Sequence, residues 1–578
     1  MQACRCVIKK RTLMYRKNYF WPLLLLCIIS LFLFLGETSF HTRGEPREAV
    51  VALTMLKDGN WILPVNNGID MAYKPPFFHW IIAAVSTVAG TINEYTSRMP
   101  SALALTAMVL VGYFFYAKRR GHELSFLTAL ITLTNFEVHR AGTNCRVDMV
   151  LTAMMVIALY QLYKWIEHGM KGVPFWAVLC LSGAALTKGP VGIVLPCMVP
   201  AVYLLLRGWN FWRVFFSFLM VAVLSCILPL VWYYAAYQQG GDKFLELVIE
   251  ENFLRFMGKM TYESHINPAY YNVYMLLAGY VPYTLLVLIS LFCLTYRKLT
   301  WSPKMWWSRL VVTIRTMDDA RLYSLLSIVI IFVFYCIPKS KRSVYLLPIY
   351  PFIAYFLAEY LIYLRHRHLN AVRWFGSIMA GLAVVLTVLF AVLRSEVFPL
   401  QEIHGISQFV QALVEVPLNV WNVILVLVPA AAAVWYFKVQ KLNAADNGIL
   451  YAMMGVIFSI YLVLDGFYQP TVLRVKSDKA VAEEIRKIVP EGRLYSYRTD
   501  IVVNNRMHPF TVNFYLGDRI VPFECFPADE GYVWMGEQEY GNFMAAFPDY
   551  ELKEVYNSHH KSCDDRRINR LYHFRRIR

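Results

Sequence analysis

Ionisable side chains stand at the ends of several apolar segments, where a charge is costly and a partner or a function is the default expectation. Asp148 begins one apolar segment and Lys188 ends another. Lys339, Lys341 and Arg342 cluster between two more. Carboxylates in such places act as general bases or hold groups that gain positive charge, and clustered cations bind anions such as phosphate. These positions are therefore the first candidates for chemistry.

A second group of ionisable residues lies between the first two long apolar segments of the chain. Glu45, Arg47 and Glu48 open this region, and Lys74 precedes two prolines near its end. It holds both carboxylates and cations, so it offers the same chemistry as the first group. The question is then which elements bring the two groups together.

Composition assigns the chain to the membrane class. Of its 578 residues, 58% are hydrophobic and only 16% are charged, and the mean hydropathy is +0.44. These values lie outside the range of average soluble domains. The net charge of +17 comes from Lys and Arg clustered between apolar segments, which indicates topology and anionic-lipid contact and argues against nucleic acid. The eleven cysteines show no zinc-binding spacing.

Hydropathy predicts an all-α polytopic membrane protein with about 13 crossings. The predicted crossings lie near 19–36, 98–117, 122–140, 147–165, 173–187, 189–206, 215–237, 270–295, 322–338, 343–364, 372–393, 418–437 and 447–465. The apolar segment from Phe77 to Ile92 is interpreted as re-entrant or surface-lying. A full crossing there would place Lys118, Arg119 and Arg120 outside, against the positive-inside rule.

This topology brings the candidate residues to one side of the membrane. The basic N-terminus lies in the cytoplasm and the first apolar segment is an uncleaved span, because no A-x-A-like cleavage site follows it. The outer side then holds a first loop at about 37–97, the junctions at 144–148 and 188–190, and the 338–342 hinge. We therefore expect the two groups of ionisable residues to meet at the outer face.

The composition changes after the last predicted span. Residues 1–468 form the predicted membrane domain, and 469–578 are predicted to form a small soluble α/β domain on the outer side. Its expected elements are helices near Asp478–Ile488 and Gln538–Phe547 and a strand near Arg493–Arg498. In an oxidising compartment Cys525 and Cys563 are available to pair.

The first outer loop carries an ordered set of motifs. They are Gly44-Glu45-Pro46-Arg47, Gly59-Asn60-Trp61-Ile62-Leu63-Pro64, Asn67-Gly68 and Tyr73-Lys74-Pro75-Pro76. Their order and spacing resemble bacterial polyprenyl-phosphate-dependent glycosyltransferases of the GT-C class, in the superfamily of the lipid A 4-amino-4-deoxyarabinose transferases and protein O-mannosyltransferases. The resemblance continues through 146–149, 186–190, 251–256, His265, 268–271 and 338–348. Two positions depart from the pattern: Gly44 replaces an Asp, and Tyr73 replaces a Glu.

The resemblance implies an enzyme that moves a sugar from a polyprenyl-phosphate donor to a lipid A-like, other glycan or protein acceptor. We expect the reaction at the periplasmic face of the bacterial inner membrane and with inversion at the anomeric carbon. We expect no cofactor and no essential metal. The implied site residues fall into three sets. They are the catalytic carboxylates Glu45, Glu48 and Asp148; the donor-phosphate cations Arg47, Lys74, Arg255, Lys339, Lys341 and Arg342; and the further candidates Lys188, His265 and Tyr345.

Structural explanations compete with each of these roles. Asp148 and Lys188 could serve only the dipoles of their helices, and Lys74 could be an interfacial lysine that extends its amine to water. The 339–342 cluster could contact lipid headgroups, and His265 could be an ordinary loop residue. For the whole protein, a lipid or polysaccharide transporter is the alternative from another class, although the sequence shows no internal repeat.

Overall fold

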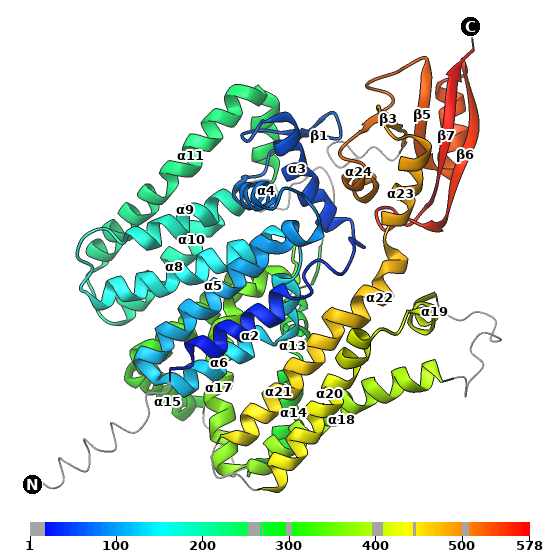
Figure 1. The fold of residues 1–578 in the computed structure, drawn as a ribbon. Coiled ribbons are helices and arrows are strands. Elements are labelled where there is room, and N and C mark those ends of the chain that lie inside the picture. Colours follow the sequence, from blue (N-terminus) through cyan, green and yellow to red (C-terminus); the bar gives the residue numbers. More distant parts are fainter. Residues whose placement is uncertain are drawn as a thin grey trace, which may run out of the picture.

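The computed structural model describes residues 18–251, 266–268, 270–295, 303–395, 408–442, 447–499 and 508–577, without the side chains of 303–306. Within these ranges the protein is largely helical, with one mixed sheet near its C-terminus. Figure 1 shows the long helices running side by side in a bundle, with the sheet beyond one end of it.

Eight helical segments in the described part of the chain are long and apolar enough to cross a membrane. They are α5 (Glu94–Arg120), α8 (Val147–Glu167), α11 (Phe211–Ile249, kinked at Gly241), α16 (Asp319–Cys336), η2 with α17 (Ser343–Arg367), α18 (Leu369–Arg394), α20 (Val420–Lys441) and α21 with its continuation (Gly448–Lys476). The pair α13 (Tyr271–Gly279) and α14 (Tyr283–Cys293) is bent by 93° and forms a ninth candidate if it counts as one span. The chain is thus a multi-pass membrane protein.

Four of the thirteen predicted crossings fall on helices that are short for a membrane span. They are α2 (Phe20–Phe32), α6 (His122–Leu133), α9 (Phe175–Lys188) and α10 (Val191–Leu206). A helix of 12 to 16 residues rises only about 18–24 Å, against roughly 30 Å of hydrocarbon. The run near 122–140 also divides, because the side chain of Asn135 accepts from the N–H of Val138 and starts α7 (Phe136–Gly142). Length and composition therefore support eight or nine spans rather than thirteen.

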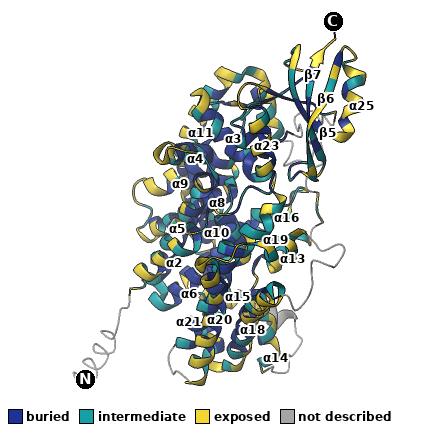
Figure 2. Cartoon of the chain, turned by 45° about the vertical axis from the view of Figure 1, so that its right-hand side comes forward, coloured by how far each residue is buried: buried dark blue, intermediate teal, exposed yellow. Residues whose placement is uncertain are grey.

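Burial places α8 at the centre of the bundle. The most apolar window of α8 is 78% buried, whereas those of α11, α18 and α20 are each 28% buried and turn most of their apolar surface outward. Figure 2 shows the same contrast, with dark blue gathered around α8 and α10. Asp148 at the start of α8 therefore stands at the end of the most enclosed helix.

The first loop is built from α3 (Gly44–Asp58), a small β1–β2 hairpin (Val65–Asn66 and Asp70–Met71) and α4 (Phe77–Ala89). Helix α3 ends at Gly59, whose φ of 71° gives the left-handed geometry that glycine adopts easily. Phe78, Ile82 and Ala83 of α4 are fully buried in a cluster shared with α3. At 13 residues, α4 lies against the protein and is short for a crossing.

The C-terminal part forms a five-stranded sheet in the order β4-β3-β5-β7-β6. Strand β3 is parallel to β4 and β5, and β7 is antiparallel to β5 and β6. The elements are α22 (Gln469–Leu473), α23 (Lys479–Ile488), β3 (Leu494–Ser496), α24 (Phe510–Tyr515), β4 (Ile520–Pro522), β5 (Glu530–Gly536), α25 (Tyr540–Ala546), β6 (Tyr550–Lys561) and β7 (Ile568–Arg576). The two helices and the strand predicted here are present. Two helices outside this part complete the list, α15 (Pro303–Thr316) and α19 (Gln408–Glu415).

The suggested disulfide is absent from the structure. Cys525 and Cys563 are both free thiols. The Cys563 Sγ instead lies 3.3 Å from Oδ2 of Asp478 and 3.2 Å from Oγ1 of Thr511, so a hydrogen-bond network takes the place of the covalent link. Burial raises the pKa of the Cys563 thiol above its usual range. The thiol is therefore held protonated and unreactive.

The sheet domain packs directly on the first loop. Asp518 accepts from the backbone N–H of Asn67 at 3.0 Å and from the hydroxyl of Thr54 at 3.0 Å. The amide of Asn513 donates to both Asn67 and Asp518, and a side chain added at Gly68 would strike Val521. Figure 1 shows α24 beside α3 and β1 at this end of the bundle.

Candidate functional site

A cavity of about 390 Å³ lies where the first loop meets the ends of α8, α9 and α16. Its wall has an apolar part, formed by residues such as Val191, Val194 and Phe334, and a strongly charged part. The charged residues that line it are Arg47, Glu48, Lys74, Arg146, Asp148, Lys188, Glu251 and Arg342. Five cations against three carboxylates leave the lining with a positive excess.

Glu48 is the carboxylate that α3 presents to this cavity. Its side chain is 6% exposed, with Oε1 2.7 Å from Nη2 of Arg47 and Oε2 3.1 Å from Nε2 of His79. Burial alone would raise the pKa of Glu48, but Arg47 and His79 outweigh it and hold that pKa well below its usual range. Glu48 is therefore ionised at neutral pH.

Two cations in the cavity have no such partner. Among the described residues, neither the ammonium of Lys74 nor the guanidinium of Arg146 donates a hydrogen bond or forms an ion pair. The nearby charge of Arg47, followed by burial, lowers the pKa of Lys74 to about 8. Cations crowded in this way attract an anion, because its binding relieves their mutual repulsion.

The opposite wall holds a buried ion pair. Asp148, in the first turn of α8, lies 2.5 Å from the Nζ of Lys188 in the last turn of α9. The Lys188 ammonium also sits 4.5 Å from the centre of the Tyr345 ring, a cation–π distance. The two helix-end charges and Tyr345 thus meet in one place.

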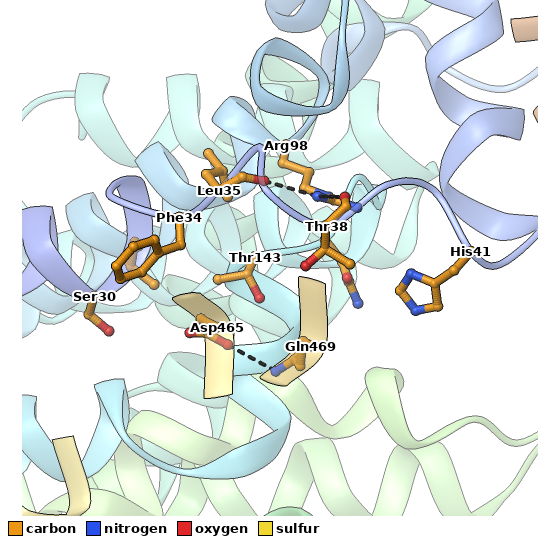
Figure 3. A pocket seen from close by; sticks show the side chains of 11 residues that line it. Ser30, Phe34, Leu35, Thr38, His41, Arg98, Thr143, Asp465 and Gln469 are labelled. Atoms are coloured by element: carbon orange, nitrogen blue, oxygen red, sulfur yellow. Dashed lines mark hydrogen bonds between the residues drawn. The ribbon is translucent and has the colours of Figure 1, made fainter. Parts of the chain in front are cut away.

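Glu45 lies three residues from Glu48 but does not line the cavity. Its two oxygens accept from Nε and Nη2 of Arg98 at 2.8 and 3.0 Å, and one also accepts from the N–H of Cys145. Arg98 further donates to the carbonyls of Leu35 and Thr38, beside a separate cavity of only about 40 Å³ (Figure 3). All these groups are satisfied within the protein. The structure therefore gives no support to the catalytic role expected for Glu45.

The remaining predicted residues divide into three groups. Arg342 lines the cavity, whereas Lys339 is exposed and does not. Lys341 is buried with its Nζ donating to the carbonyls of Asn267 and Pro338, which marks it as a residue that fixes the hinge. Arg255 and His265 lie outside the described residues.

Sequence reasoning passed over two residues that line the cavity and one that contacts a lining residue. Arg146 and Glu251 stand inside motifs that carried the resemblance, so their positions were a usable signal. His79 gave no signal of its own, since only the fold reveals that its ring meets Glu48. Tyr73, the departure from the family pattern, also lines the wall.

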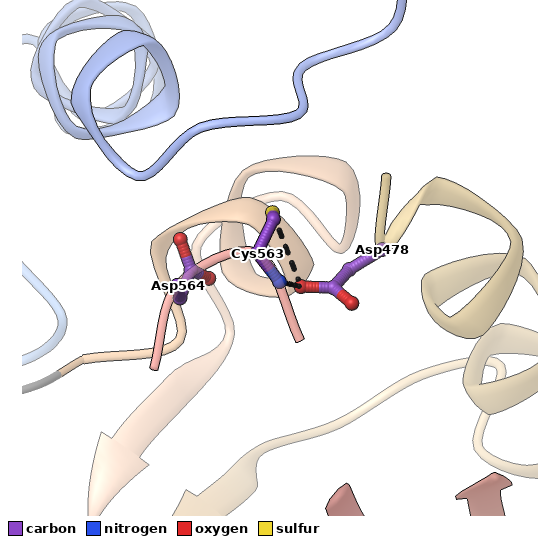
Figure 4. Close-up of side chains that lie close together, drawn as sticks. All are labelled: Asp478, Cys563 and Asp564. Atoms are coloured by element: carbon purple, nitrogen blue, oxygen red, sulfur yellow. Dashed lines mark hydrogen bonds between the residues drawn. The ribbon is translucent and has the colours of Figure 1, made fainter. Parts of the chain in front are cut away.

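One cluster elsewhere has the composition of a cation site. Asp478, Cys563 and Asp564 in the sheet domain have ligand atoms within 4.8 Å of one another (Figure 4). Asp478 already accepts from Ser562, His560 and the N–H of Cys563, and Asp564 accepts from Thr511. Burial raises the pKa of Asp564 to about 7. Each group is used by the fold, so we assign no metal to it.

Known proteins resemble the chain in sequence and in fold. A family model described as dolichyl-phosphate-mannose-protein mannosyltransferase matches residues 73–233. An undecaprenyl phosphate-alpha-4-amino-4-deoxy-L-arabinose arabinosyl transferase from Proteus mirabilis is 25% identical over 66% of this chain and 66% of its own length. The same transferase from Shewanella sediminis is 25% identical over 57% of both chains. An uncharacterized protein from Aquifex aeolicus is 26% identical over 84% of this chain and 85% of its own.

The fold matches a solved structure over nearly its whole length. ArnT from Cupriavidus metallidurans, crystallised with undecaprenyl phosphate, superposes with a TM-score of 0.69 at 20% identity and covers 97% of this chain and 98% of its own. The chain is a GT-C glycosyltransferase. This glycosyltransferase uses a sugar donor on a polyprenyl phosphate, and the family and enzyme class expected from its motifs are confirmed. The transporter alternative is set aside.

Proposed function

We propose that this glycosyltransferase moves a sugar from a polyprenyl-phosphate carrier to a lipid A-like or other envelope acceptor, with inversion and without an essential metal. One observation carries the proposal. In the cavity, Glu48 and Asp148 each pair with a cation, whereas among the described residues neither Lys74 nor Arg146 forms an ion pair or donates a side-chain hydrogen bond. These two cations are therefore available to an anionic group such as a phosphate.

The cations supply what the departing carrier needs. As the bond between the anomeric carbon and the phosphate oxygen breaks, its electron pair stays on the phosphate and negative charge develops there. Lys74, Arg47 and Arg146 already line the partly apolar cavity, so they stabilise that charge from positions next to the phosphate. Because cations do this work, we expect transfer to continue in the presence of a chelator.

The carboxylates serve the acceptor side. The acceptor oxygen forms the new bond to the anomeric carbon from the face opposite the phosphate, which inverts the configuration. When the acceptor is a hydroxyl, Glu48 or Asp148 takes its proton; when it is a phosphate oxygen, no base is required. Their ionised state also favours the sugar ring as it gains positive character.

The membrane placement follows from the charge pattern of the loops. We place the N-terminus in the cytoplasm of a bacterial inner membrane and take the apolar segment 19–36, which contains α2, as the first crossing. The cavity, the first loop and the domain 469–578 then lie on the periplasmic side. The apolar part of the cavity wall, which includes Val191, Val194 and Phe334, gives the isoprenoid tail a surface to lie on. This division assigns 1–468 to the membrane domain.

A protein acceptor is the second candidate, because the matching family model is described as a protein mannosyltransferase. The two candidates differ in their product. A labelled lipid extracted into organic solvent supports the envelope-lipid acceptor, and label retained in precipitated protein and released by β-elimination supports a Ser or Thr acceptor.

The test is transfer of radiolabelled sugar from polyprenyl-phosphate donors to membrane acceptors. We would compare the wild type with Lys74→Ala, Asp148→Asn and Glu48→Gln at equal amounts of folded protein, with Lys171→Ala as the matched control because Lys171 is exposed and lies outside the cavity. We expect the three cavity variants to lose at least about 100-fold in rate and the control to keep the wild-type rate. Absence of wild-type transfer over a broad donor panel would refute the proposal.

A further inference from the structure

A glycine at the start of α3 gives an arginine its place in the cavity. A Cβ atom added at Gly44 would lie 1.8 Å from Nη1 and 2.9 Å from Cζ of Arg146. Real Cβ atoms do not approach other heavy atoms that closely. The guanidinium of Arg146 therefore fills the volume that any side chain at position 44 would need.

Arg146 connects the two charged halves of the cavity. It lines the wall and occupies the N-cap of α8 in an extended conformation, with φ −143° and ψ 141°. Its charge acts on Lys74 on the first-loop side and on Asp148 on the α8 side. In the described part of the chain its guanidinium donates no hydrogen bond, so its donors remain available to a ligand.

The departure at position 44 thereby affects the surroundings of the Arg146 guanidinium. The related pattern has Asp where this chain has Gly44, and a carboxylate there would meet the guanidinium and neutralise it. With glycine, the guanidinium of Arg146 keeps this place, and its charge acts on the ammonium of Lys74. Two neighbouring cations that form no ion pair among the described residues suit a phosphate monoester, and the planar guanidinium can hold two of its oxygens.

We propose that Arg146 binds the phosphate of the polyprenyl carrier and that Gly44 is a positioning residue, required because it leaves room for that guanidinium. This proposal rests on the proposed function, which supplies the carrier. Arg146 was not among the phosphate-binding cations expected from the sequence. The proposal also gives a structural reason for the glycine at position 44.

A double-mutant cycle on carrier binding tests the pair directly. Affinity for undecaprenyl phosphate would be measured with purified full-length protein for the wild type, Gly44→Ala, Arg146→Gln and the double variant. Gly44→Ala removes no charge, and the atoms it strikes are the far end of a flexible side chain, so the guanidinium moves while the fold stays. We expect each single variant to bind about tenfold more weakly and the double variant to match Arg146→Gln.

Two control variants separate this effect from general damage. Gly381→Ala adds a methyl to another helical glycine that has open space around it, and Arg140→Gln removes a surface arginine that is paired with Glu137 outside the cavity. Both should bind the carrier with wild-type affinity. Thermal unfolding of all six proteins verifies that each is folded.

The outcomes distinguish this inference from the proposed function. Failure of the wild type to bind the carrier counts against the proposed function itself. Wild-type binding combined with independent, additive losses from Gly44→Ala and Arg146→Gln overturns the coupling of the two residues. Unchanged carrier affinity in both single variants, with transfer still reduced, assigns Arg146 to the acceptor and overturns the inference as well.

Discussion

The N-terminal part of α3 carries two carboxylates, three residues apart, that lie in different surroundings. Glu45 turns toward Arg98, where every donor and acceptor finds a partner inside the protein. Glu48 turns toward the cavity, where Arg47 and His79 hold it beside cations that have no partner of their own. Sequence spacing treats the two residues almost alike, but their surroundings differ.

The contrast separates a charge that holds the fold from one that serves a ligand. Both carboxylates are buried, and both have a pKa below the usual range because an arginine outweighs the effect of burial. Neither burial nor ionisation therefore distinguishes them. The two carboxylates differ in the charges around them. The groups that contact Glu45 are all paired within the protein, whereas the cavity lining that includes Glu48 has more cations than carboxylates.

The largest expected difference is catalytic. Glu48→Gln should lower the rate of sugar transfer by about 10²- to 10⁴-fold, since a general base contributes that much to a hydroxyl acceptor. Glu45→Gln, compared per amount of folded protein, should leave the rate within a few-fold of the wild type. Equal losses of rate in the two variants would show that Glu45 and Glu48 do not differ in their catalytic role.

The second expected effect is on stability, where the surroundings of Glu45 matter more than those of Glu48. Arg98→Leu leaves the carboxylate of Glu45 buried without its cation and should reduce stability by about 3–5 kcal/mol, the usual consequence of breaking a buried pair. Unfolding in detergent, followed by intrinsic fluorescence, measures it. Lys487→Ala, which breaks an exposed pair with Glu484, is the control. A stable Arg98→Leu protein would show that the cluster does not support the fold.

Carrier binding should weaken at alkaline pH. The charge of Arg47 and burial lower the pKa of Lys74 to about 8 in the free protein, and a bound phosphate favours the protonated amine. Affinity is therefore full below pH 8 and falls above it by up to about tenfold per pH unit. Lys74→Arg should remove this decline, because an arginine stays charged. A flat profile in the wild type would exclude Lys74 from phosphate binding.

The smallest effect concerns the contact between the first loop and the sheet domain. Asp518→Ala removes the acceptor for the N–H of Asn67 and the hydroxyl of Thr54, at a cost of about 1–3 kcal/mol. Limited proteolysis should then cut the β1–β2 hairpin faster. The substitution Asp529→Ala, at an exposed position just before β5, provides a comparison. Unchanged cleavage would mean that the hairpin is held by other contacts.

Periodicity and composition were sufficient to predict the helices, because a lipid-facing or buried helix needs a continuous apolar sequence. A helix covers each predicted crossing within the described residues, and the helix and strand positions after 469 were close to those observed. Helix length was harder to predict. A hydropathy window of about 19 residues does not detect that Asn135 divides one apolar segment, and it counts α9, which has only 14 residues, as a full crossing.

The site was predictable as a set of motifs but not as a set of contacts. Spacing indicated that Lys74, Asp148 and Lys188 share one side, and all three line the cavity. The partners of Glu45 could not be read from sequence, because Arg98 and Cys145 are 53 and 100 residues away. Arg146 was visible in a motif, yet its role depends on the space that Gly44 leaves for its guanidinium, which only the three-dimensional structure reveals.

The hydrogen bonds between Asp518 and the first loop also bear on the order in which the enzyme folds during synthesis. Thr54 and Asn67 leave the ribosome early, but the carboxylate that anchors them is 464 and 451 residues further along the chain. All the candidate spans enter the membrane before that anchor exists. We therefore expect the first loop to reach its final conformation only after translation is complete, so that a nascent chain already in the bilayer is not yet a working transferase.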